Sequence, residues 1–184
     1  MTFSCKPTSV FFAVLLGLGA ASSFAQIVVG GSPMPASKDI IDSAVSSKEH
    51  TTFVAAVKAA GLVDTLKSAG PFTVFAPTNA AFAALPAGTL DILLKPENKG
   101  MLTSILTYHV VPGKVDAAAL TKMIMDGKGS TTFKTVAGGM LTAKSVGGRL
   151  MITDEKGGSS TVTITDVYQS NGVIHVVDKV LLPK

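Results

Sequence analysis

The sequence predicts an α+β domain whose core is an antiparallel β-sandwich or folded sheet, accompanied by several short helices. Two observations carry this prediction. Between residues 38 and 106, the apolar residues recur mostly with the spacing of amphipathic helices. From residue 108 onward, short runs of strand character alternate with Gly-Gly and Asn-Gly turns, which are typical of antiparallel hairpins. Because helices and strands do not strictly alternate, a doubly wound parallel sheet is not expected.

The first 25 residues have the composition of a secretory signal peptide. Lys6 supplies a positive charge, residues 10–20 are apolar, and the small residues Ser23 and Ala25 suit cleavage after position 25. The apolar run is too short to span a bilayer stably, so no membrane anchor is expected after cleavage. Cleavage would also remove Cys5, the one cysteine of the chain. The exported protein is therefore expected to lack disulfides, thiol nucleophiles and cysteine–metal sites, and to be secreted or periplasmic.

The charge of the exported chain argues against nucleic-acid binding. Without Lys6, the 16 basic residues become 15 and face 12 acidic ones, a net charge of +3. These charges are spread thinly, with a single arginine at Arg149 and no basic run. The chain has no tryptophan and two tyrosines, Tyr108 and Tyr168, so no aromatic platform for stacking on sugars is evident.

The segment after the predicted cleavage site has a different composition from the rest. Residues 26–37 contain Gly30-Gly31 and two prolines, a composition that predicts a flexible lead. No second linker and no repeat follows Lys38, so residues 38–184 are expected to form one domain. The 159 residues left after cleavage (184 minus 25) suffice for one hydrophobic core.

Helical spacing recurs in short segments, several of them with a residue suited to cap the helix. Ser37 can cap the first helix, Asn79 the fourth and Asp116 the last, while Gly61 stands where a left-handed residue would end the second. The predicted helices cover residues 40–45, 53–60, 62–66, 80–85, 90–94, 101–106 and 117–125.

The strands are predicted at apolar or β-branched runs between turns, at residues 72–75, 108–111, 131–136, 140–146, 150–153, 161–167 and 173–182. The threonines at positions 161, 163 and 165 alternate with apolar residues, as in a half-exposed strand. Two interpretations stay open for that strand. It can be an edge that accepts a strand from a partner, or an interior antiparallel strand.

The histidines do not form an evident catalytic group. His175 and Asp178 lie three apart on a predicted strand and so face opposite sides, which leaves His175 as a packing residue. Tyr108 and His109 are neighbours on a predicted strand, so one should be buried and the other exposed. With His50, the three histidines show no metal-ligand spacing. We expect no catalytic residue, metal site or cofactor; a hydrolase using His175 or His109 is the least favoured alternative.

Three segments resemble the fasciclin-type (FAS1) domain. They are Thr73-Val-Phe-Ala-Pro-Thr-Asn79, then Tyr108-His109, then Asn171-Gly-Val-Ile-His175 with its Asp178-Lys-Val-Leu-Leu-Pro183 tail. The order and spacing of the segments are similar to those of the family, from about Lys38 to the C-terminus. The small single-domain format with a signal peptide resembles secreted bacterial members. The resemblance implies a sandwich-like wedge of about seven strands with helices packed along one side. The residues that carry the motif are Thr73, Phe75, Pro77, Thr78, Asn79, Asn171, Gly172 and His175.

The resemblance also implies a function. FAS1 domains are extracellular adhesion modules, generally without enzymatic activity, and no cofactor is implied. In animal members, adhesion maps to the Tyr-His segment and to an acidic residue followed by a branched aliphatic one. Here those positions are Tyr108, His109, Asp166 and Val167. The animal forms read Asp-Ile-Leu or Asp-Ile-Met at this point, whereas this chain reads Asp166-Val167-Tyr168. The expected partner is an extracellular or cell-surface protein or polysaccharide, bound by a monomer.

One alternative of another class stays open. Short helices packed against a sheet can enclose an apolar cleft, which would suit a small-molecule carrier or an envelope-associated ligand-binding protein.

Overall fold

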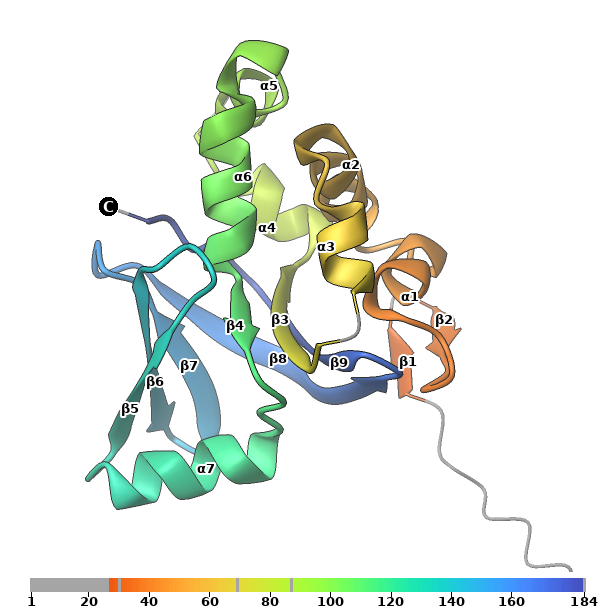
Figure 1. The fold of residues 1–184 in the computed structure, drawn as a ribbon. Coiled ribbons are helices and arrows are strands. Elements are labelled where there is room, and N and C mark those ends of the chain that lie inside the picture. Colours follow the sequence, from red (N-terminus) through yellow and green to blue (C-terminus); the bar gives the residue numbers. More distant parts are fainter. Residues whose placement is uncertain (1–26, 30, 69, 87, 184) are drawn as a thin grey trace, which may run out of the picture.

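The computed structural model describes residues 27–29, 31–68, 70–86 and 88–183; the predicted signal peptide lies outside them. Within the described chain, one large sheet curls almost into a barrel (Figure 1). The helices α1 to α6 gather over one side of this sheet, whereas α7 lies at its far end. Among these residues, no helix combines the length and apolar character needed to cross a membrane.

The predicted helices are confirmed, with shifted ends. Asp39 caps the first helix instead of Ser37, because its carboxylate accepts from the backbone N–H of Asp42 at 2.8 Å. Thr78 likewise replaces Asn79 as the cap of the fourth helix. The caps predicted at Gly61 and Asp116 are confirmed. The helices are α1 (Ile40–Ser46), α2 (Thr51–Ala60), α3 (Val63–Lys67), α4 (Asn79–Ala83), α5 (Thr89–Leu93), α6 (Lys99–Tyr108) and α7 (Ala117–Asp126), with a 3₁₀ turn at Pro96–Asn98.

The predicted flexible lead is wrong where the structure describes it. β1 (Ile27–Val29) and β2 (Ser32–Met34) form an antiparallel hairpin. Val29 and Met34 are buried in the core beneath the helices. The glycines and prolines marked a turn correctly, but Ile27 and Val29 of β1 stabilise the hairpin by packing on the domain, whereas Val28 between them is exposed.

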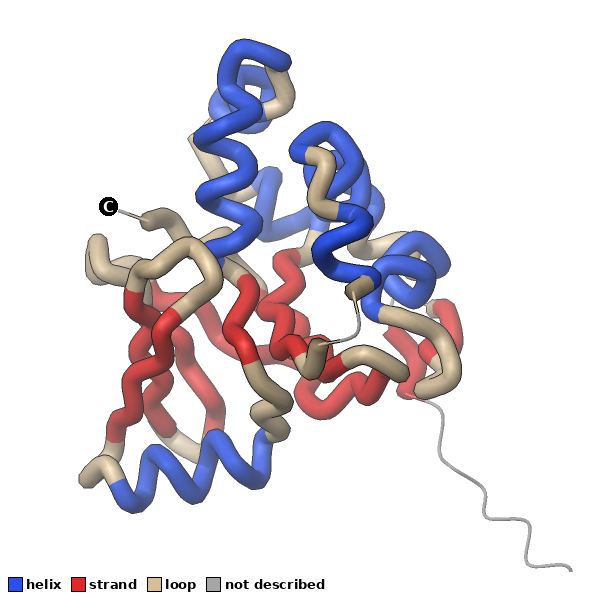
Figure 2. The backbone as a smooth tube through the Cα atoms, in the orientation of Figure 1, coloured by secondary structure: helices blue, strands red, loops and turns tan. Residues whose placement is uncertain are grey.

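The large sheet is a mixed sheet, and it is not a two-sheet sandwich. Its strands are β3 (Phe72–Pro77), β4 (Val110–Pro112), β5 (Ser130–Lys134), β6 (Met140–Val146), β7 (Arg149–Thr153), β8 (Ser159–Gln169) and β9 (Gly172–Val177). They lie in the order β4-β3-β9-β8-β7-β6-β5, and all pairs are antiparallel except β3 with β9. Figure 2 shows the strands gathered together, with most of the helices on one side of them. The two edges meet where Val136 N–H donates to the carbonyl of Val110 at 2.8 Å. β8, which carries the alternating threonines, lies between β7 and β9, so the edge-strand interpretation is wrong.

The sheet separates two hydrophobic cores. Val74 on β3 and Ile174 on β9 face the core under α1 to α6. Phe75, next to Val74, and Val177, three residues after Ile174, face the interior of the barrel, as the alternation of a strand requires. Leu120, together with Ile124 of α7, closes that interior. The prediction of helices along one side therefore holds for α1 to α6 and fails for α7.

Candidate adhesion surface

Two asparagines of the motif connect elements that are far apart in sequence. Asn79 accepts from the backbone N–H of Thr52 at 3.0 Å and donates to the carbonyl of Lys48 at 2.9 Å, which fixes the start of α2. Asn171 accepts from Ile40 N–H at 3.1 Å and donates to the carbonyl of Leu66 at 2.6 Å. The turn between β8 and β9 is thereby tied to α1 and α3.

Thr73 and Gly172 hold the backbone around β3. The hydroxyl of Thr73 donates to the carbonyl of Gly113 at 2.7 Å and accepts from Val115 N–H at 2.8 Å. A Cβ atom on Gly172 would lie 2.0 Å from the carbonyl oxygen of Phe72, so this pairing of β3 and β9 requires glycine.

His175 is a buried packing residue, as predicted. Its Nε2–H donates to the carbonyl of Val115 at 2.8 Å, and its ring stacks on Phe75 with 5.6 Å between centroids. Burial lowers the pKa of this imidazole and keeps it neutral. Phe75 and Pro77 are also buried. The motif residues thus hold the scaffold together.

Tyr108 and His109 are both buried, so the prediction that one of them is exposed is wrong. The reason is local: α6 continues through Tyr108, His109 caps it, and the strand begins only at Val110. The phenol of Tyr108 donates to the carbonyl of Met140 at 2.8 Å and accepts from Glu155 N–H at 3.1 Å.

The imidazole of His109 is held in one neutral form. Its Nδ1–H donates to the carbonyl of Ile105 at 2.8 Å, and its Nε2 accepts from Leu181 N–H at 3.0 Å. Complete burial lowers the pKa of His109 to about 4. Both side chains therefore act inside the fold.

Asp166 stands on an irregular part of β8. The register shifts between Ile164 and Val167, and Asp166 takes a left-handed backbone with φ of 59°. This bulge directs its carboxylate to the start of α7, where Oδ1 accepts from Ala117 N–H at 2.6 Å. Val167 is fully buried, so Asp166 alone among the four predicted adhesion residues keeps accessible surface.

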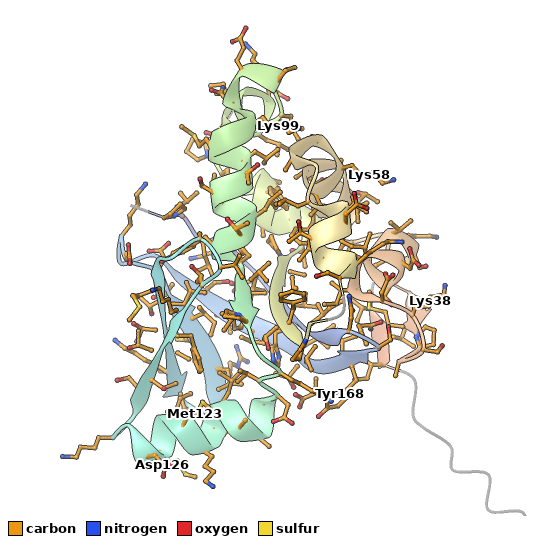
Figure 3. All side chains as sticks on the ribbon, in the orientation of Figure 1. Lys38, Lys58, Lys99, Met123, Asp126 and Tyr168 are labelled. Carbon is orange, nitrogen blue, oxygen red and sulfur yellow. The ribbon has the colours of Figure 1, made fainter. Side chains whose placement is uncertain are left out.

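Three residues near Asp166 that the sequence analysis did not select as site residues, Lys114, Asp116 and Tyr168, complete an accessible group. Tyr168 is 40% exposed and lies by the N-terminal end of α7 (Figure 3). The ammonium of Lys114 lies 4.9 Å from the centre of its ring. Partial burial and the nearby carboxylates of Asp166 and Asp116 raise the pKa of the Tyr168 phenol. We call Lys114, Asp116, Asp166 and Tyr168 the α7-end patch. Successive side chains of a strand face opposite sides, so the burial of Val167 indicates that Tyr168, the next residue, is exposed.

The structure does not bring the two halves of the predicted site together. Tyr108 and His109 bond to α6, β6, the β7–β8 turn and the C-terminal segment, whereas Asp166 bonds to α7. Within the described part of the chain, no hydrogen bond or salt bridge joins Asp166 to either residue, and no three His, Asp or Glu side chains could hold a metal ion together.

The fold and this arrangement of motif residues define a fasciclin-type domain. A solved FAS1 domain pair from the insect cell adhesion molecule fasciclin I superposes with a TM-score of 0.71 and 21% sequence identity. The likeness covers 79% of this chain and 51% of that one, about half its length. The family model for the fasciclin domain matches residues 48–183. The chain belongs to the fasciclin domain family.

Relatives from bacteria support the same assignment. Protein sll1483 of Synechocystis is 48% identical over 156 residues, which cover 85% of this chain and 79% of the relative. The cell surface glycolipoprotein MPB83 of Mycobacterium bovis is 35% identical over 176 residues, covering 92% of this chain and 72% of the relative.

Proposed function

We propose that the protein is an exported, non-enzymatic adhesion module that binds an extracellular or cell-surface protein or polysaccharide as a monomer. The observation that carries the proposal is the α7-end patch, an accessible group of charged and aromatic side chains in a domain of an adhesion family. The insect fasciclin I is named as a cell adhesion molecule, and MPB83 as a cell surface protein. Both names favour a role outside the cell.

The chemistry of the patch suits recognition. Tyr168 offers a broad, rigid ring with a polar tip, which is the kind of side chain enriched at the centres of interfaces. Asp166 and Asp116 add carboxylates on one side, and Lys114 adds an ammonium on the ring. Because Asp166 is already bonded to Ala117, its position is set before a partner arrives.

The buried residues of the predicted site have a positioning role in this proposal. Val167 fills the core directly beside Asp166 and fixes the bulge from the inside. Tyr108 and His109 fix the opposite end of the barrel. Their replacement is expected to weaken adhesion through loss of the fold, since neither side chain has accessible surface.

The test is a capture experiment with the immobilised protein. Envelope and polysaccharide fractions of the producing cells, and a panel of matrix proteins, are passed over the wild type and over Asp166→Asn and Tyr168→Ala. Asp126→Asn is the control, because Asp126 is an exposed carboxylate at the other end of α7 (Figure 3).

Saturable capture that falls for Asp166→Asn and Tyr168→Ala, and stays for Asp126→Asn, is the expected result. Equal capture by all four proteins would overturn the location of the site. No capture from any fraction would overturn the adhesion function.

A further inference from the structure

A hollow of about 620 Å³ lies beside α5 and α6. In Figure 1, α5 and α6 lie at the end of the molecule opposite α7. Its walls come from α5, from α6, from the turn between β7 and β8, and from the C-terminal segment that follows β9. We call it the α5–α6 hollow. Its lining consists of Thr89, Leu93, Met101, Ser104, Ile105, Lys156, Leu182 and Pro183.

Most of this lining is apolar. Leu93 and Ile105 are buried at its base, and Leu182 forms part of its wall. Met101, in contrast, is 58% exposed, so a long, flexible apolar side chain of the lining is largely accessible to solvent. Covering Met101 and the apolar wall with an apolar molecule would release water from this surface, which is favourable.

The polar groups of the hollow are few. Lys156 is the one charged residue in the lining. Ser104 uses its hydroxyl hydrogen to donate to the carbonyl of Gly100 at 3.0 Å, which leaves its oxygen free to accept only. The single charge that the lining presents is therefore positive.

Buried polar groups hold the walls in place. The carboxylate of Asp154 accepts from Lys156 N–H at 3.0 Å and, through its second oxygen, from Leu182 N–H at 3.1 Å. One side chain thus positions the turn that carries the cation and the segment that carries the apolar wall. His109 acts in the same way, because it bridges the carbonyl of Ile105 and the N–H of Leu181. The hollow is preformed, as ligand sites usually are.

We propose that the α5–α6 hollow binds a free long-chain carboxylate, with the alkyl chain against Leu93, Ile105 and Leu182 and the head group at Lys156. The hollow has the volume typical of small-molecule sites, roughly 300–1,000 Å³. An alkyl chain matches the apolar wall, and one carboxylate matches the one cation of the lining. Tyr108 and His109 then serve this site as positioning residues. The inference is independent of the adhesion proposal, which concerns the α7-end patch.

The experiment is a calorimetric titration of the delipidated protein with dodecanoate and with dodecanol, both below their aggregation limits. Lys156→Glu and Met101→Glu are compared with Lys122→Glu and Met125→Glu, which change an exposed lysine and a 68% exposed methionine on α7. Thermal unfolding of each variant checks that it is folded.

Dodecanoate is expected to bind at one site. Lys156→Glu should weaken dodecanoate by about tenfold, the size expected for loss of a charge-assisted contact, and leave dodecanol unchanged. Met101→Glu should weaken both ligands, and the two α7 variants should weaken neither. Asp166→Asn should leave dodecanoate binding intact even if it abolishes adhesion.

Three results would overturn the inference: no heat with either ligand, binding that both hollow variants leave unchanged, or binding to anionic vesicles without binding to free dodecanoate.

Discussion

His109 accepts a hydrogen bond at Nε2 from the backbone N–H of Leu181, and this 3.0 Å contact joins the end of α6 to a residue 72 positions later. The contact exists only while the imidazole is neutral, because a protonated ring has no acceptor. The other ring nitrogen donates to Ile105 in the same turn of α6. Residues 178–183, which follow β9 and form no strand or helix, are thereby held to the domain by the titratable imidazole of His109.

The first prediction is that acid destabilises the protein through this histidine. Its pKa is about 4 in the folded state and about 6.5 when exposed, so the unfolded chain takes up the proton first as the pH falls. The stability due to neutral His109 is complete above about pH 6.5 and is lost progressively down to about pH 4, by about 3 kcal/mol in total. Burial lowers the pKa of His50 and His175 too, so these histidines also reduce the stability of the folded protein as the pH falls.

Urea unfolding at several pH values between about 7.5 and 4 measures this loss. His109→Gln keeps a donor and an acceptor but does not titrate, so its stability should fall less over the same range. Equal losses in the two proteins would show that His109 does not cause the acid sensitivity.

The second prediction concerns Gly172. In Gly172→Ala the new methyl group would meet the carbonyl oxygen of Phe72 at 2.0 Å, so β3 and β9 would have to separate. We expect a loss of about 3 kcal/mol in the free energy of unfolding, the upper range for overpacking. Gly100→Ala is the matched control, because Gly100 lies in α6 with open space around its Cβ position. That change should be neutral or should stabilise α6 by about 0.5 kcal/mol.

The sequence predicted the local elements well, because each depends on residues close to it. The helix over 53–60 with Gly61 and the strand over 140–146 follow from periodicity and from turn residues. The motif of residues 73–79 also located the strand β3.

The errors came from contacts between residues far apart in sequence. Nothing near 72–77 indicates that β3 pairs in parallel with β9, and nothing near 27–29 indicates the core that buries Val29. At Tyr108 the apolar run suited a strand, but α6 continues two residues beyond the predicted end at residue 106 and includes Tyr108. The bulge that exposes Asp166 beside Tyr168 likewise depends on the start of α7.

The third prediction separates the two hydrogen bonds of Asn171. Asn171→Asp keeps the acceptor for Ile40 N–H but replaces the donor to the Leu66 carbonyl with an oxygen. We expect Asn171→Asp to lower the free energy of unfolding by about 2 kcal/mol. Asn171→Ala, which loses both hydrogen bonds, should lower it more. Asn98→Ala is the control, since Asn98 makes one exposed bond to the carbonyl of Ile92 and should cost less than about 1 kcal/mol. A similar cost for all three changes would show that Asn171 does not join the helices as described.

The last prediction tests the geometry of the α7-end patch without a partner. Partial burial, then the carboxylates of Asp166 and Asp116, raise the pKa of the Tyr168 phenol, because a phenolate is disfavoured near negative charge. Asp166→Asn should therefore lower the pKa of Tyr168, whereas Asp126→Asn, at the far end of α7, should leave it unchanged. Carbon-labelled tyrosine followed by NMR distinguishes this phenol from that of Tyr108. An unchanged pKa in Asp166→Asn would mean that the carboxylate does not face the ring, and a binding site built on both side chains would then lose its basis.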